Sequence, residues 1–454
     1  MEKKAHVLLV PFPAQGHITP VLQFYKRLVS KGVKATLVTT TYISNSTHSD
    51  PSIPFDIETI SDGFDDGGYE QAENPHVYFT TFKSVGSQTL ANLIRKLKDS
   101  GNSIDALIYD GSIPWARDVA KQFGVLGVLF FTQSCAVNSI YYHVNRGLLR
   151  LPLLGKPVSL PGLPLLEASE TPSFIGSYGS YPTFFDVVVN QFSNIDDADT
   201  DWVLCSTFYE LEKEVVDWMA RKWRVKTIGP TLPSMYLDKQ IENDKAYGVS
   251  LFNPDTSSVL GTWLDNKPTG SIVYVSFGSL AELGAEQMEE IGWGLKQSNC
   301  YFLWVVRASE QAKLPNNFIE ETSEKGLVVT WCPQLKVLAH ESIGCFVTHC
   351  GFNSVLEALS LGVPMVAMPR WTDQTTNAMY VENVWRTGIR VCLDDQEIVR
   401  KEVLEECIRR VLWGDEGKEI KKNANKWRDL AKEAIDVGGS SDRNIDEFVA
   451  HLVH

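Results

Sequence analysis

The sequence predicts an α/β protein built from two Rossmann-like, doubly wound domains. Short apolar runs of branched residues alternate with helix-like segments, a pattern typical of parallel sheets covered on both faces. The alternation occurs twice, once on each side of a polar segment. The length of 454 residues exceeds what one hydrophobic core usually organises, so two domains of roughly 200 residues are expected.

The first half of the chain contains the first alternating set. A helix is predicted after the first strand. We expect it to end at Lys31-Gly32, because this pair is a common helix-terminating signal. Prolines and glycines crowd residues 151–182, where periodicity fails, and this predicts a binding or lid loop. The predicted strands and helices are residues 7–10 (strand), 19–30 (helix), 33–40 and 55–59 (strands), 77–97 (helix), 104–109, 125–131 and 202–206 (strands), and a helix from Glu210.

The second half repeats the pattern after a polar stretch at about residues 230–255. We expect a first domain at 1–235, a linker at 236–255 where the composition changes, and a second domain at 256–439. Two doubly wound domains in tandem place a cleft between the carboxyl ends of their sheets, where such folds bind ligands. The predicted strands and helices are residues 272–276 (strand), 285–297 (helix), 301–306, 327–330 and 345–348 (strands), 353–361 (helix) and 363–368 (strand).

Composition excludes several classes of partner. The net charge of −14 argues against nucleic acid and against an anionic membrane surface, since both require a basic face. The first residues, MEKKAHVLLVPFP, resemble neither a secretory signal nor a membrane span, and no apolar run approaches ~18 residues. Eight scattered cysteines are typical of reduced thiols in a long chain. We therefore expect a cytoplasmic enzyme without stable membrane insertion.

Several motifs for cofactors and metals are missing or incomplete. No glycine fingerprint for nicotinamide or flavin, no triphosphate-binding loop and no nucleophile elbow occurs. The acidic run 197–201 is a candidate metal site, but it precedes the apolar run 202–205 instead of following it, which favours a solvated turn. A second mixed set lacks a C-x-x-C pair, so a metal cluster is disfavoured there: His340, Cys345, His349 and Cys350.

The segment from Trp331 to Gln374 concentrates the chemistry. A strand and the turn His349-Cys350-Gly351-Phe352 are predicted to lead into a helix that opens at Asn353-Ser354. A helix N-terminus offers free N–H groups and a partial positive charge, so two phosphates fit there. The alternative is that Asn353-Ser354 only caps the helix. The neighbours favour a ligand: Trp331 is placed to stack on a base, Glu357 to accept from ribose hydroxyls, and Asp373-Gln374 to read a sugar.

This segment resembles the signature box of the family 1 plant secondary-product glycosyltransferases, which also runs from Trp to Gln. The resemblance extends to PFPAQGH, LPGLP, STFYELE, IGP and VSFGS elsewhere in the chain. It implies a GT-B type fold, with an N-terminal acceptor-binding domain, a C-terminal nucleotide-sugar-binding domain and a C-terminal helix near 440–454 that packs back on the first domain. It also implies inverting, metal-independent transfer of glucose from UDP-glucose, with no cofactor. The chain is most similar to the group acting on benzoates, auxin-like acids, steroids and terpenoids.

The resemblance also implies roles for individual residues. Trp331 would stack on uracil, with the Cys332 backbone bonding its edge, and Gln334 and Glu357 would hold the ribose. Phe352 departs from the family, which usually has Trp there, so its effect depends on whether its ring or only its backbone faces the sugar. The resemblance also implies diphosphate contacts from His349, Asn353, Ser354 and Ser279, and sugar contacts from Asp373, Gln374 and Thr132. Trp371 would wall the pocket, and Gly351 is a further implied residue of the UDP-sugar site.

A catalytic pair is expected in the first domain. His17 follows the first strand, and Asp110 ends a strand of the same sheet, so both should lie at its carboxyl edge. Each residue alone is more often structural, but together they form a base and the group that orients it. The resemblance assigns both positions those roles.

Two other functions remain open from sequence. A phosphorylase or epimerase-like enzyme shares this fold class, but no motif marks a lysine for pyridoxal phosphate. A nucleotide-sugar-binding protein without chemistry needs neither His17 nor Asp110. The acceptor itself is unreadable, and we expect loop segments 171–185, 133–142 and 43–45 to select it. We expect a monomer.

Overall fold

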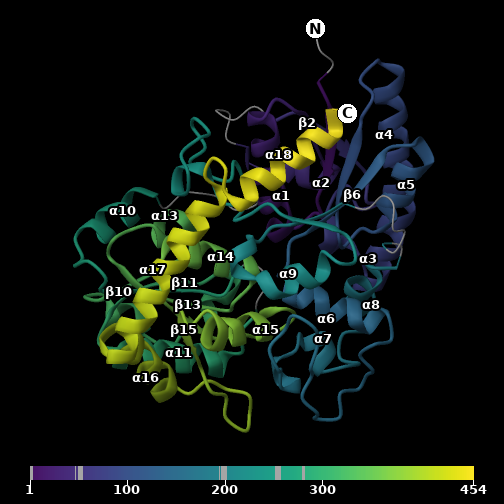
Figure 1. The fold of residues 1–454 in the computed structure, drawn as a ribbon. Helices are drawn as coiled ribbons and strands as arrows, with labels where there is room; N and C mark the ends of the chain where they lie inside the picture. Colours follow the sequence, from purple (N-terminus) through teal and green to yellow (C-terminus); the bar gives the residue numbers. More distant parts are fainter. Residues whose placement is uncertain are drawn as a thin grey trace. The chain divides into compact units, whose positions relative to one another are not determined.

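The computed structural model describes residues 4–46, 48–49, 55–193, 195, 202–250, 257–278 and 282–453. It divides into two compact units: unit 1 comprises Met1–Leu251 and Lys432–His454, and unit 2 comprises Phe252–Ala431. Each unit contains one parallel sheet with helices packed on it (Figure 1), and the predicted α/β class with two Rossmann-like domains is confirmed. Within the described part of the chain, no helix is long and apolar enough to cross a membrane.

The sheet of unit 1 has seven parallel strands in the order β4-β2-β1-β5-β6-β7-β8. The central strands are buried on both faces, which explains their uninterrupted apolar sequences. Sequence order reverses direction between β1 and β5, so the switch point of this sheet lies there. The strands are β1 (His6–Val10), β2 (Lys34–Thr40), β4 (Ile57–Ile60), β5 (Ala106–Asp110), β6 (Leu126–Phe131), β7 (Trp202–Cys205) and β8 (Arg224–Thr227), with β3 (His48–Ser49) and β9 (Val249–Ser250) forming a separate small sheet.

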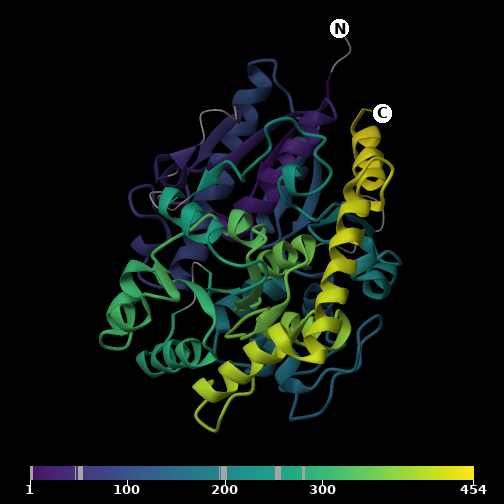
Figure 2. The ribbon, with the colours of Figure 1, turned by 90° about the vertical axis from the view of Figure 1, so that its left-hand side faces the viewer.

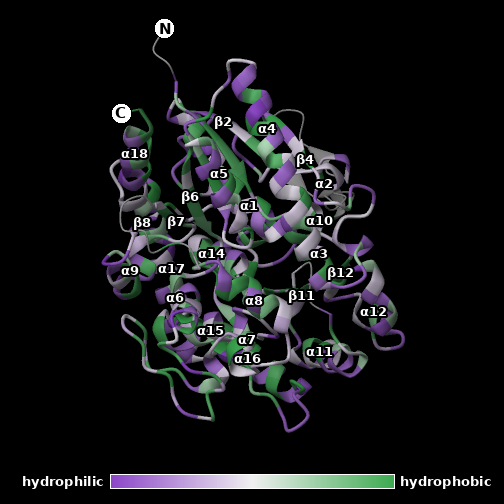
Figure 3. Cartoon of the chain, turned by 90° about the vertical axis from the view of Figure 1, so that its right-hand side faces the viewer, coloured by the Kyte–Doolittle hydropathy of each residue, from purple (hydrophilic) through white to green (hydrophobic). Residues whose placement is uncertain are grey.

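The helices of unit 1 carry their polar residues outward. In Figure 3 the strands near β6 are hydrophobic, whereas α4 and α5 show hydrophilic residues on the side turned to the viewer. Because Gly86 has no side chain, the Phe82 and Trp115 rings pack closely where a π-helical turn divides the predicted helix 77–97. The helices are α1 (Gln15–Ser30), α2 (Thr41–Ser46), α3 (Pro75–Thr81), α4 (Ser87–Asp99), α5 (Trp115–Phe123), α6 (Cys135–Asn145), α7 (Ser173–Gly176), α8 (Pro182–Asn190), α9 (Lys213–Met219) and α18 (Ser440–Val453).

Most of the predicted linker, residues 236–255, belongs to unit 1 instead. The boundary falls after Leu251, because polar residues of this segment are buried ion-pair partners of α1. The Lys26 ammonium lies 2.6 Å from the Asp244 carboxylate, and the Arg27 guanidinium binds both carboxylate oxygens of Asp238. The polar composition that suggested a linker therefore reflects side chains that anchor the segment.

Helix α18 packs on unit 1 (Figures 1 and 2). Its Phe448 ring contacts the rings of Phe24 in α1 and Trp202 in β7. Its Ser441 hydroxyl donates a hydrogen bond of 2.6 Å to the Gly229 carbonyl. The end of the chain therefore completes the unit that begins with β1.

The sheet of unit 2 has six parallel strands in the order β12-β11-β10-β13-β14-β15, so its order reverses between β10 and β13. Side chains of β10, β11 and β13 form a core with α11 and α16. The strands are β10 (Ile272–Ser276), β11 (Tyr301–Val305), β12 (Gly326–Val329), β13 (Ile343–Thr348), β14 (Met365–Ala367) and β15 (Gly388–Arg390). The helices are α10 (Ser257–Asp265), α11 (Ala285–Ser298), α12 (Phe318–Thr322), α13 (Gln334–Leu338), α14 (Phe352–Leu361), α15 (Gln374–Met379), α16 (Lys401–Trp413) and α17 (Asp415–Ile435).

Candidate active site

The structure brings His17 and Asp110 together at the switch point of the unit 1 sheet. Strand β5 lies beside β1, with Val10 in register with Tyr109, so Asp110 ends its strand next to the loop that leads into α1. Helix α1 begins at Gln15, four residues before the predicted start at Thr19, so His17 lies in its first turn. Its Nδ1 is 2.7 Å from Asp110 Oδ2.

The hydrogen bonds of Asp110 fix the state of the His17 ring. Asp110 is 1% exposed, and its other oxygen, Oδ1, accepts a hydrogen bond of 2.8 Å from the Ser112 backbone N–H. A carboxylate only accepts hydrogen bonds, so His17 Nδ1 carries the hydrogen and Nε2 keeps its lone pair. The His17 side chain is 28% exposed, which leaves the ring accessible to a substrate. This is the arrangement of a general base and its orienting group.

Thr132 lies at the same edge of the sheet, directly after β6. Its Oγ1 is 3.3 Å from His17 Nδ1, a contact that the sequence did not predict. The buried carboxylate of Glu212 holds the following helix, α6, by accepting from the Cys135 and Ala136 backbone N–H groups at 3.1 and 2.9 Å. Burial raises the pKa of Glu212. Glu212 therefore anchors the segment that carries Thr132.

Aromatic rings extend from His17 along one side of unit 1. The Phe12 ring meets the His17 ring edge-on at 5.3 Å and stacks on Phe79 of α3 at 5.6 Å. Phe79 in turn contacts Phe184 of α8 at 6.0 Å. These three phenylalanines are only partly buried, so they place apolar surface beside the base. Phe184 belongs to the predicted acceptor segment 171–185, whereas Phe12 and Phe79 were missed by sequence reasoning.

In unit 2, the turn after β13 leads into the N-terminus of α14. We expected Asn353-Ser354 to open this helix, but it begins at Phe352, with Gly351 as its N-cap and no side-chain cap. The Phe352 side chain is only 3% exposed. Asn353 and Ser354 thus lie in the first turn, and the interpretation that they only cap the helix is wrong.

His349 occupies this turn beside two glycines. A Cβ on Gly278 would lie 2.8 Å from the His349 Nε2, and a Cβ on Gly351 would lie 2.6 Å from it, so both positions exclude side chains. Burial lowers the pKa of His349 to about 4, which keeps the ring neutral at physiological pH. No described residue bonds its buried Nδ1. Together, this turn and the N-terminus of α14 offer hydrogen-bond donors of the kind that hold anions in proteins.

Gln334 and Glu357 form a connected pair beside the same helix. The Gln334 Nε2 donates to Glu357 Oε2 at 2.5 Å and to the Ser354 hydroxyl oxygen at 3.0 Å. Trp331 follows β12 and is partly exposed, and the next residue, Cys332, is buried. Sequence reasoning named these residues but missed the tyrosine behind them: the Tyr274 hydroxyl lies 3.1 Å from Gln334 Oε1.

The turn before α15 brings Trp371, Asp373 and Gln374 into one loop. Gln374 Oε1 accepts from the Arg370 and Trp371 backbone N–H groups at 2.9 and 3.1 Å, so the side-chain amide holds its own turn. Asn377, which the sequence did not suggest, donates 2.7 Å to Asp373 Oδ2 and 3.0 Å to the Cys350 carbonyl. It thereby ties the Asp373 loop to the His349 turn.

Two predictions fall on residues that the structure does not describe. Ser279 and the acidic run 197–201 lie outside the described residues. Within the ranges that are described, no group of three or more His, Cys, Asp or Glu side chains is arranged to hold a metal ion. Two of the four residues considered as a second metal site have other surroundings. The His340 ring bonds Ser342 and Asp265, and Cys345 lies in the core.

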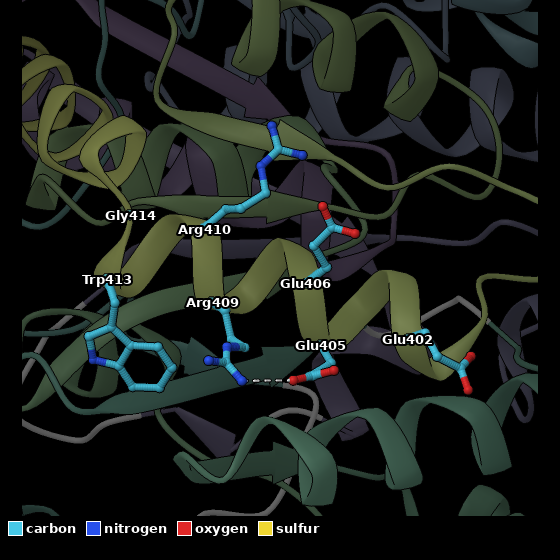
Figure 4. A pocket seen from close by; sticks show the side chains of 7 residues that line it. All are labelled: Glu402, Glu405, Glu406, Arg409, Arg410, Trp413 and Gly414. Atoms are coloured by element: carbon cyan, nitrogen blue, oxygen red, sulfur yellow. Dashed lines mark hydrogen bonds and ion pairs between the residues drawn. The ribbon is translucent and has the colours of Figure 1, made fainter.

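A hollow on the outer face of α16 is separate from these residues (Figure 4). Glu405 and Arg409 form an ion pair of 3.2 Å across one helical turn, and Trp413 is exposed. None of the predicted site residues lines the hollow. Its charged residues form a solvated helix face rather than a catalytic constellation.

Comparison with known proteins gives a consistent set of relatives. A family profile described as "UDP-glucoronosyl and UDP-glucosyl transferase" matches residues 253–433. The chain is 49% identical to flavonol 7-O-beta-glucosyltransferase UGT74F1 of Arabidopsis thaliana, over 100% of this chain and 99% of the relative. It is also 49% identical to mogroside I-E synthase of Siraitia grosvenorii, with the same coverage. The solved structure of Os79 from O. sativa in complex with UDP superposes with a TM-score of 0.92 and 42% identity, covering 98% of this chain and 100% of Os79.

Proposed function

The chain belongs to the family 1 plant UDP-glycosyltransferases, and on that premise we propose that it transfers glucose from UDP-glucose to a small lipophilic acceptor. The acceptor group is a hydroxyl or a carboxyl. The reaction inverts the anomeric carbon and needs no metal ion. The observation that carries this proposal is the His17–Asp110 pair at 2.7 Å, because a protein that only binds nucleotide sugars has no use for an oriented base.

His17 acts on the acceptor. Its Nε2 removes the proton of the acceptor hydroxyl while that oxygen bonds to the anomeric carbon of the sugar. The bond from the anomeric carbon to the β-phosphate oxygen breaks in the same step, and UDP leaves with the electron pair. Asp110 stabilises the imidazolium that forms on His17. Each group placed in this way contributes a rate factor of about 10²–10⁴.

The residues of unit 2 act on the leaving group and the sugar. The N-terminus of α14, the first-turn side chains Asn353 and Ser354, and a neutral His349 N–H supply hydrogen bonds to the diphosphate. Preorganised groups of this kind are each worth about 3 kcal/mol in a transition state. Trp331 stacks on uracil, and Asp373 and Gln374 read the sugar hydroxyls. Ser279 is assigned to the diphosphate by its place in the VSFGS motif alone.

The surface beside the base supports a lipophilic acceptor. Phe12 contacts His17, Phe79 contacts Phe12 and Phe184 contacts Phe79, so partly buried rings lead away from the base, and such rings favour apolar ring systems. Relatives are named for different scaffolds, a flavonol in one and a mogroside in another, and Os79 was solved with a trichothecene. These names agree with a lipophilic acceptor without selecting one.

The eight cysteines all have free thiols, in accord with the cytoplasmic location that we propose.

The test is release of UDP by the purified protein. UDP-glucose, UDP-galactose and UDP-glucuronate are each supplied with a panel of phenols, sterols, terpenoid alcohols and aromatic acids, and products are identified by mass and anomeric configuration. We expect fastest turnover with UDP-glucose and a β-linked product. Faster turnover with galactose or glucuronate overturns the choice of sugar. Tight UDP binding without transfer to any acceptor favours the binding-protein alternative.

A further inference from the structure

A buried tyrosine stands behind the residues assigned to the ribose. Tyr274 lies in the middle of β10 and is 1% exposed. Its hydroxyl oxygen is 3.1 Å from Gln334 Oε1 and 3.4 Å from Cys332 Sγ. With so little exposure, this side chain acts on a ligand only through its neighbours.

Chemistry decides the direction of these hydrogen bonds. Burial raises the pKa of Tyr274 well above its ordinary value and the pKa of Cys332 to about 12, so both groups keep their hydrogens. Gln334 Oε1 is a carbonyl oxygen and only accepts, whereas the thiol can donate to the tyrosine oxygen. The single hydroxyl hydrogen of Tyr274 therefore goes to Gln334, and Cys332 donates to Tyr274.

The Gln334 amide is held at both ends, by Tyr274 at Oε1 and by Glu357 at Nε2. With Oε1 turned to Tyr274, Nε2 faces Glu357 Oε2 at 2.5 Å and the Ser354 hydroxyl oxygen at 3.0 Å. The Glu357 carboxylate opposes the flipped amide, which would place a carbonyl oxygen against it, whereas the Tyr274 hydroxyl can donate to Oε1 or accept from Nε2. Without the tyrosine hydroxyl, Gln334 Oε1 loses this partner, and the amide that bonds Glu357, a residue only 5% exposed, is held less firmly in place.

We propose that Tyr274 is a positioning residue that fixes Gln334 and Glu357 in the geometry for reading ribose hydroxyls, and that it thereby sets the preference for ribonucleotide over deoxyribonucleotide sugar donors. The inference rests on the proposed function, in which Gln334 and Glu357 hold the ribose. It assigns a role to a residue that touches neither the nucleotide nor the sugar. If Tyr274 has this role, removing its hydroxyl should weaken the preference for UDP over deoxy-UDP without a comparable loss of turnover.

The experiment measures binding of UDP, 2′-deoxy-UDP and 3′-deoxy-UDP to the full chain by calorimetry. We expect wild-type protein to prefer UDP by roughly 10-fold or more, the usual worth of a hydrogen bond to a charged group. In Tyr274→Phe this preference should fall at least about 5-fold, while kcat with saturating UDP-glucose changes less than about 3-fold. Tyr301→Phe is the matched control: it removes a tyrosine hydroxyl at the start of the neighbouring strand β11 and should leave the preference unchanged.

A double-mutant cycle shows whether Tyr274 acts through Gln334. In the Gln334→Ala background, Tyr274→Phe should have no further effect on the preference. Wild-type protein that fails to bind UDP contradicts the proposed function. Protein that binds UDP but shows the same preference with and without the Tyr274 hydroxyl, or no preference at all, overturns this inference alone.

A measurement on the unaltered chain covers the case in which Tyr274→Phe does not fold. The Gln334 side-chain amide signals, assigned by their loss in Gln334→Ala, should exchange hydrogen with solvent at least about 10-fold more slowly than those of an exposed glutamine. Exchange as fast as that of an exposed glutamine overturns the locked orientation.

Discussion

Replacing Asp110 by Asn tests how much the carboxylate contributes to catalysis. In the wild-type protein, Asp110 is 1% exposed and accepts hydrogen bonds from His17 Nδ1 and the Ser112 N–H. When His17 takes a proton, the charges of the two side chains lie about 4 Å apart, and at an effective dielectric constant of about 20 their attraction is about 4 kcal/mol. Solvent reaching the partly exposed His17 ring reduces this value. We therefore expect kcat to fall by about 10²–10³.

The geometry adds a second penalty to this variant. An asparagine presents one acceptor and one NH₂ group, yet both positions face N–H groups, so the amide satisfies only one of them. If its oxygen stays with Ser112, the His17 ring adopts the other tautomer and Nε2 no longer accepts a proton.

The assay for Asp110→Asn is the initial rate with a phenolic or alcoholic acceptor at saturating UDP-glucose, together with UDP affinity and thermal unfolding. UDP affinity should be unchanged, since the nucleotide contacts are assigned to unit 2. Asp118→Asn, an exposed position in α5, serves as the matched control and should keep wild-type rates. A kcat within threefold of wild type in a folded Asp110→Asn variant would refute the reasoning.

Two further predictions concern metal ions and pH. Turnover should survive excess EDTA, because hydrogen bonds from N–H groups and neutral side chains stabilise the leaving diphosphate. Activity that is lost to EDTA and restored by manganese would contradict this. Burial alone would raise the pKa of Asp238, but Arg27 and Ser234 outweigh burial and lower it. The Asp238 carboxylate therefore stabilises the folded state above pH about 4, and this stabilisation is lost as the pH falls toward the lowered pKa. Asp238→Asn should cost about 3 kcal/mol in denaturant unfolding at pH 7, and less near pH 3; equal stability at pH 7 would rule out the ion pair.

The sheets were predictable because their strands are buried on both faces. Strand β10 matches its predicted limits, residues 272–276, since apolar branched runs have few alternatives to a central parallel strand. Strands β8 and β15 were missed because both lie at sheet edges, where RVKT and GIR carry no continuous apolar signal. The linker was misplaced because composition does not distinguish solvated charges from the buried partners of Lys26 and Arg27.

The sequence predicted the site residues that follow strands, but it did not predict the residues that support them. His17 and Asp110 each follow a recognisable strand, and parallel strands bring their carboxyl ends to one edge. Tyr274 lies inside an apolar strand, where the sequence offers no reason to separate it from the core residues around it. Asn377 carries a weak signal, its spacing of four residues from Asp373 on one helix, which does not reveal the long-range bond to Cys350.

The account rests on His17 as the base, and the acidity of the acceptor tests this most directly. An alcohol must lose its proton during transfer, whereas a carboxylic acid is already ionised at neutral pH and needs no base. We expect His17→Ala to lower kcat for an alcohol acceptor by about 10²–10⁴, to change ester formation far less, and to leave UDP affinity nearly unchanged. Alcohol glucosylation at a near wild-type rate in His17→Ala would contradict the account and make His17 a structural histidine.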